Sequence, residues 1–99
     1  MQTLTFKKVM KTNVLIVQMR DYVDIIAVSD NEEVLSAKLK EEVRNILTYR
    51  CGAREDLNPE TDSYELDLWE SLDNCAGKYW SDEDDECPIK VYIVEADKL

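Results

Sequence analysis

The stretch SDNEEVLSAKLKEEVRNILTYRCG, residues 29–52, decides the fold, because it carries the clearest secondary-structure signal in the chain. Its apolar residues recur at steps of three and four, which places them on one face of a helix. They are Val34, Leu35, Leu39, Val43, Ile46 and Leu47. Its start carries two overlapping capping boxes, Ser29 with Glu32 and Asp30 with Glu33. Gly52 can end it, so the stretch predicts a long amphipathic helix.

Short segments rich in branched residues precede this helix, at residues 3–10, 14–19 and 23–28. Such segments are typical of β-strands. The last two carry apolar residues on both faces, which favours central positions, whereas lysines make the first suitable for a sheet edge. The polar links at residues 11–13 and 20–21 are short. We therefore expect an antiparallel meander of three strands.

After the helix, residues 53–63 are polar and contain Pro59, as expected of a connector. A capping box of Asp62 with Glu65 then predicts a second helix. Its apolar side comprises Leu68, Trp69, Leu72, Cys75 and Ala76, and Tyr79 is a further candidate. Gly77 is expected to end the helical pattern. We interpret residues 81–86 as an acidic loop and residues 89–95 as a last strand.

The order βββααβ predicts a small α+β domain spanning residues 1–99. We expect an antiparallel sheet of about four strands with both helices packed on one face. A split arrangement, in which the last strand is inserted centrally in the sheet, is the alternative.

Composition excludes several classes of function. The 99 residues include no histidine, which removes Ser-His-Asp and Cys-His catalysis and any imidazole metal site. The two glycines lie in no phosphate-binding loop. No uninterrupted apolar run is longer than that of residues 14–17, which is far shorter than the ~20 residues of a membrane span. We expect a cytoplasmic protein that is not an enzyme and does not bind membranes.

Metal and cofactor binding are not expected either. Cys51, Cys75 and Cys87 have no CxxC spacing, and an odd number cannot pair within one molecule, so we expect reduced, structural thiols. Residues 56–67 partly match a calcium loop, but Thr61 stands where the sharp turn requires glycine. Weak cation association with the acidic run at residues 82–86 stays open.

Charge is distributed unevenly along the chain. Residues 1–50 carry a net charge of +1, while residues 51–99 carry −11, giving −10 in total. Such acidity opposes direct binding to nucleic acid and favours a cationic partner surface. We predict partner contacts by a row of carboxylates on the second helix, by the acidic run and by one aromatic anchor. They are Asp67, Glu70, Asp73, Trp80, Asp82, Glu83, Asp84, Asp85 and Glu86.

Trp80 has two interpretations. Beside the acidic run it could anchor an arginine-rich partner surface. Alternatively, Tyr79 and Trp80 fold back over the open face of the sheet. The carboxylates are also open to a second interpretation, in which they form a solvated face that only keeps the protein soluble.

No motif identifies a family. In size, acidity and lack of catalytic residues, the chain resembles small phage-encoded inhibitors of host defence systems, including anti-CRISPR and DNA-mimic proteins. That resemblance implies an inhibitor or regulator that engages a basic, nucleic-acid-binding surface of a partner protein. The alternative is an accessory or subunit domain that binds through a neutral surface or by self-association. Oligomeric state stays open.

Overall fold

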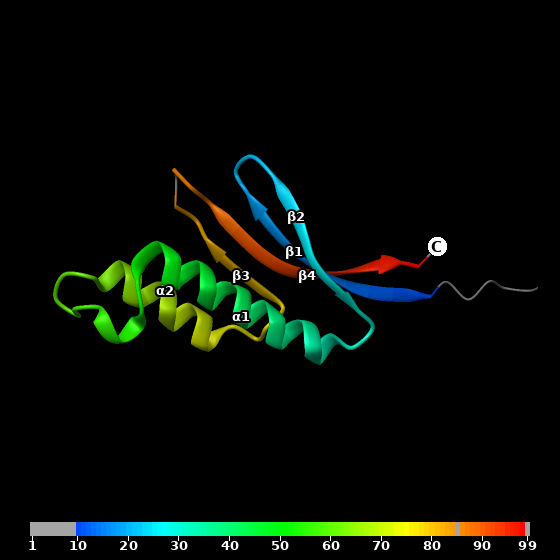
Figure 1. The fold of residues 1–99 in the computed structure, drawn as a ribbon, viewed down its shortest axis with the longest axis horizontal. Helices are drawn as coiled ribbons and strands as arrows, with labels where there is room; N and C mark the ends of the chain where they lie inside the picture. The colour runs from blue at the N-terminus through cyan, green and yellow to red at the C-terminus, as the bar shows by residue number, and fades with distance from the viewer. Residues whose placement is uncertain (1–9, 85, 99) are drawn as a thin grey trace, which may run out of the picture.

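The computed structural model describes residues 10–84 and 86–98. The elements are β1 (Lys11–Met19), β2 (Val23–Ser29), α1 (Glu32–Cys51), the short 3-10 helix η1 (Arg54–Asp56), α2 (Ser63–Asn74), β3 (Tyr79–Asp82) and β4 (Ile89–Asp97). All strand pairs are antiparallel, and the sheet order is β2-β1-β4-β3. The predicted α+β class, with a four-stranded antiparallel sheet and two helices, is confirmed (Figure 1).

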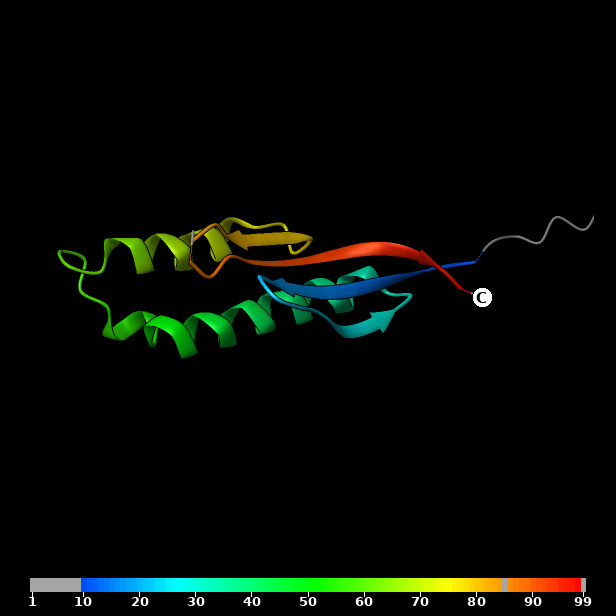
Figure 2. The ribbon, with the colours of Figure 1, turned by 90° about the horizontal axis from the view of Figure 1, so that it is seen from above.

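The last strand is central, as in the split arrangement. β4 pairs with β1 along its whole length, from Lys11 opposite Asp97 to Met19 opposite Ile89. Residues 11–13, predicted as a turn, therefore begin β1, and that prediction is wrong. They lie at the end of the sheet where β1 and β4 project beyond the helices (Figure 2), with Lys11 exposed and Thr12 buried. The strand predicted at residues 3–10 lies, apart from Met10, outside the described residues.

α1 forms where the apolar periodicity predicts it, but its cap is displaced. Asn31 is the N-cap residue, and its Oδ1 accepts hydrogen bonds from the backbone N–H of Glu33 at 3.0 Å and of Val34 at 3.4 Å. The predicted boxes at Ser29 and Asp30 are therefore wrong by one or two residues. Gly52 ends the helix with φ 86°, a left-handed value that glycine adopts without strain.

α2 begins after Asp62, as predicted, yet the capping box is absent. The Asp62 carboxylate instead accepts a hydrogen bond from the Asn58 N–H at 2.8 Å and closes the connector before the helix. The helix ends at Asn74, before Gly77. Figures 1 and 2 show α1 and α2 running antiparallel, joined at one end of the molecule by the connector that contains η1.

The core lies between the two helices and one face of the sheet. α1 contributes Leu35, Leu39, Val43 and Leu47, α2 contributes Trp69 and Leu72, and the strands contribute Leu15, Val17, Trp80, Ile89 and Val91. Period-two alternation turns the intervening strand residues to the opposite side, which we call the open face. The open face comprises Thr12, Val14, Ile16, Gln18, Val23, Ile25, Val28, Tyr79, Ser81, Lys90, Tyr92, Val94 and Ala96.

Candidate functional site: the acidic end

Exposed carboxylates gather at the end of the molecule where the two helices are joined. η1 and the connector supply some, the outer side of α2 supplies others, and the loop from β3 to β4 lies over the same half of the molecule (Figure 1). We call this surface the acidic end. Its carboxylates are Glu55, Asp56, Glu60, Asp67, Glu70, Glu83, Asp84 and Glu86, all exposed except the half-buried Asp84.

The row of carboxylates predicted on α2 is only partly present. Asp67 and Glu70 are exposed on the side of the helix turned away from the core. Asp73, in contrast, forms an ion pair with Arg54. Both residues line the groove between α1 and α2, together with Arg44. Two carboxylates of α2 therefore face solvent without a partner in the described residues, while the charge of Asp73 is compensated by its own chain.

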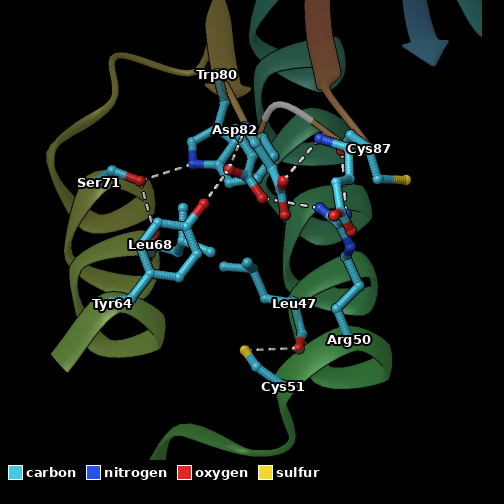
Figure 3. A network of polar contacts seen from close by, with 11 residues as sticks. Leu47, Arg50, Cys51, Tyr64, Leu68, Ser71, Trp80, Asp82 and Cys87 are labelled. Carbon is cyan, nitrogen blue, oxygen red and sulfur yellow. Dashed lines mark hydrogen bonds and ion pairs between the residues drawn. The ribbon is translucent and has the colours of Figure 1, made fainter. Parts of the chain in front are cut away.

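Asp82 is not a partner-binding residue but a buried structural one, which corrects the prediction. Its side chain is 3% exposed, and its Oδ2 lies 2.8 Å from Nη1 of Arg50 in α1. The Tyr64 hydroxyl, from α2, donates a hydrogen bond to Oδ1 at 2.7 Å (Figure 3). A buried carboxylate requires such partners, because an unpaired charge out of water is very costly. Asp82 therefore connects β3 to both helices.

The same carboxylate organises the acidic loop. The Asp84 N–H donates to Asp82 Oδ1 at 3.2 Å, and the Glu86 N–H donates to Asp84 Oδ1 at 2.9 Å. Arg50 also donates from Nη2 to the Cys87 carbonyl at 3.1 Å. The loop is thus held from its inner side, and the side chains of Glu83 and Glu86 remain exposed. Asp85 lies outside the described residues.

Trp80 is part of the core, so the prediction of a surface anchor is wrong. It is 2% exposed, and its Nε1 donates to Ser71 Oγ of α2 at 2.8 Å (Figure 3). Ser71 in turn donates to the Leu68 carbonyl at 2.6 Å. Trp80 does not fold back over the open face either, because it belongs to β3 and faces the helices. Only Tyr79, its neighbour, lies on the open face.

The titratable groups around Asp82 are not poised for nucleophilic chemistry. The hydrogen bond to the Asp82 carboxylate raises the pKa of Tyr64 to about 12, with burial and the nearby charge of Asp82 acting in the same direction. Burial likewise raises the pKa of the Cys51 thiol, which donates to the Leu47 carbonyl at 3.0 Å. At neutral pH both groups are therefore protonated. Within residues 10–84 and 86–98 no acidic or thiol side chains cluster as metal ligands.

Sequence reasoning missed Glu55, Asp56 and Glu60 as members of the charged surface. The charge asymmetry between the two halves includes them, and their place directly before α2 along the chain is the signal that could have found them. Glu65 of α2 and Asp84 of the loop line one shallow hollow, so the acids of these two elements adjoin. Arg50 and Tyr64, the two side-chain partners of Asp82, could not be predicted from a local pattern, because both lie in helices that are distant from Asp82 along the chain.

Comparisons with known proteins identify no relative. No protein family model matches the chain, and no significant match is found among curated proteins or among solved structures. No helix among the described residues is long and apolar enough to cross a membrane.

Proposed function

We propose that this chain is a small protein-binding module, an inhibitor or regulator rather than an enzyme, whose acidic end engages a basic surface of a partner protein. The observation that supports the proposal is the gathering of exposed carboxylates from η1, α2 and the β3–β4 loop in the half of the molecule where the two helices are joined. Asp67 and Glu70, with Glu83 and Glu86 of the loop, supply the charge that faces outward.

The spacing of these charges suits a surface that normally holds nucleic acid. Asp67 and Glu70 are three residues apart, which separates them by about 4.5 Å along a helix axis. Phosphates along one DNA strand are about 3.4 Å apart. A partner whose groove binds a polynucleotide would therefore bind the acidic end instead, and its association would be accelerated by the long-range field. Competition with nucleic acid is the proposed mode of inhibition.

A charge-neutralisation pair tests the proposal. Asp67→Asn with Glu70→Gln removes two charges from the acidic end, and Asp24→Asn with Glu33→Gln removes two exposed charges elsewhere. The probe is an arginine-rich peptide, titrated by fluorescence anisotropy at rising salt concentration. We expect the first variant to bind roughly fivefold or more weakly and the control within about twofold of the parent, with affinity falling steeply as salt rises.

Capture from the source lysate at low and high salt then identifies the physiological partner by mass spectrometry. A DNA duplex added to that complex should displace the chain. Equal weakening by both variants would mean that only net charge matters, and an affinity insensitive to salt would show that the carboxylates do not contribute. Either result rejects the acidic end as the binding surface.

A further inference from the structure

The open face carries a second, unrelated surface on the opposite side of the sheet. Apolar side chains from three neighbouring strands adjoin there, because cross-strand partners share a face: Val14 pairs with Val28 and Val94, and Ile16 pairs with Ile25. Ile25 is 63% exposed, Val23 59% and Val28 57%. Both helices pack on the other face, and no helix among residues 10–84 and 86–98 covers this one. Val14, flanked by Val28 and Val94 at its centre, is itself only 9% exposed, so the exposed apolar surface is supplied mainly by β2.

The open face is also nearly free of charge. Lys90 is its one charged residue among the described strands, and no carboxylate lies on it. In a chain with 34% charged residues and a net charge of −10, a surface selected only for contact with water would carry several acids. Charge depletion together with exposed apolar and aromatic side chains is the composition of an interface core.

Two of the polar side chains on the open face, Tyr92 and Gln18, are paired with each other, which lowers the cost of burying them. The Tyr92 hydroxyl donates to Gln18 Oε1 at 3.0 Å across the β1–β4 pair. A partner therefore has to supply mainly apolar surface, with Lys90 left at the solvated margin of the contact. A second copy of this chain presents such a surface.

We propose that the open faces of two copies pack together in a symmetric dimer. The charge of α2 does not forbid it, because Asp67 and Glu70 lie on the outer side of α2, on the far side of their own sheet. Stacked sheets lie about 10 Å apart, and a helix layer adds about 10 Å on each side. The α2 carboxylates of the two copies are then roughly 30 Å apart, well beyond the Debye length of about 8 Å at physiological salt.

The area available predicts a weak dimer. With a rise of about 3.4 Å per residue and strands about 4.8 Å apart, the four strands cover roughly 500 Å² on each copy. A standard stable interface buries about 800 Å² on each partner. The dimer should therefore form reversibly, with a dissociation constant in the micromolar range or weaker.

Sedimentation velocity of the full chain over roughly 1–500 µM tests the proposal, since it covers the expected dissociation range. We expect a monomer–dimer equilibrium that Ile25→Lys weakens at least about tenfold, because it places a desolvated charge in the apolar contact. Ile25 is exposed in the monomer, so folding should survive, which circular dichroism checks. Tyr49→Lys, at a 93% exposed position of α1, is the matched control and should leave the dimer unchanged.

Salt and truncation distinguish the alternatives. Higher salt should leave the dimer unchanged or strengthen it, whereas binding through the acidic end should weaken, so the two proposals fail separately. The proposal is overturned if the chain is monomeric throughout the concentration range. It is also overturned if Ile25→Lys leaves the dimer dissociation constant unchanged. Dimerisation only after deletion of residues 2–9 would overturn it too, because the N-terminal segment would then be the occupant of the open face.

Discussion

At the scale of single residues, Asp82 is the carboxylate whose observed role differs most from the predicted one, since it forms a buried ion pair with Arg50 instead of facing a partner. Its pairing with Arg50 and Tyr64 predicts that Asp82→Ala destabilises the fold by about 2–4 kcal/mol, because the half-buried guanidinium and the Tyr64 hydroxyl lose their acceptor. Glu83→Ala, its exposed neighbour, should cost less than about 0.5 kcal/mol. Urea unfolding followed by tryptophan fluorescence measures both, and equal midpoints would contradict the structural role of Asp82.

Tyr64 provides a prediction in alkaline solution. Its pKa is about 12 in the folded chain against an ordinary value of 10.0, since the neutral phenol donates to the Asp82 carboxylate. A raised pKa contributes stability that is fully present below pH 10 and is lost as pH rises through 12. The free energy of unfolding should therefore fall across this window in the parent and less in Tyr64→Phe. Parallel curves for the two proteins would show that the hydrogen bond is absent in solution.

At the scale of elements, the turn between α2 and β3 depends on a close approach to α1. Gly77 has φ 78°, and a Cβ there would lie 2.8 Å from Ser36 Cβ. Gly52 has a similar φ of 86°, but a Cβ would meet nothing within 4 Å. Gly52→Ala should therefore cost only the backbone strain, about 1–3 kcal/mol, and Gly77→Ala roughly 1–3 kcal/mol more from overpacking. Thermal unfolding compares the pair, and equal losses would refute the close contact.

The elements differ in how well the sequence predicts them, for a physical reason. The apolar periodicity of α1 is local, so the helix is predicted within a residue or two at each end. β3 escapes prediction because its four residues, YWSD, bury Trp80 and Asp82 on one face. An aspartate on the buried side contradicts the strand pattern and becomes intelligible only through Arg50, 32 residues away. The strand therefore depends on tertiary contacts that no local window contains.

The candidate site shows the same limit at a larger scale. Charge counting assigns the excess acid to the second half of the chain, and the exposure of Asp67, Glu70, Glu83 and Glu86 agrees with their predicted availability. Counting cannot tell which acids are compensated, and Asp73 with Arg54 and Asp82 with Arg50 are pairs that only the fold creates. The open face could not be predicted from the sequence either, because its residues come together only through the order and register of the strands.

At the scale of the whole molecule, two electrostatic effects of opposite sign compete. Repulsion among uncompensated carboxylates in a chain of net charge −10 opposes folding, whereas ion pairs such as Lys78 with Glu32 and Lys98 with Asp30 favour it. These two pairs are largely exposed and therefore worth little, about 0–1 kcal/mol each. The repulsion should prevail, so raising the salt concentration should increase the free energy of unfolding.

The neutralised variants locate that repulsion. Asp67→Asn with Glu70→Gln should stabilise the chain at low salt and reduce the gain from added salt, because it dilutes the densest concentration of acids. Asp24→Asn with Glu33→Gln, which lie outside the acidic end, should stabilise less. Urea unfolding at low and high salt gives both comparisons. Destabilisation of the parent by salt would mean that the ion pairs outweigh the repulsion, and the acidic end would then have no strong field to offer a partner.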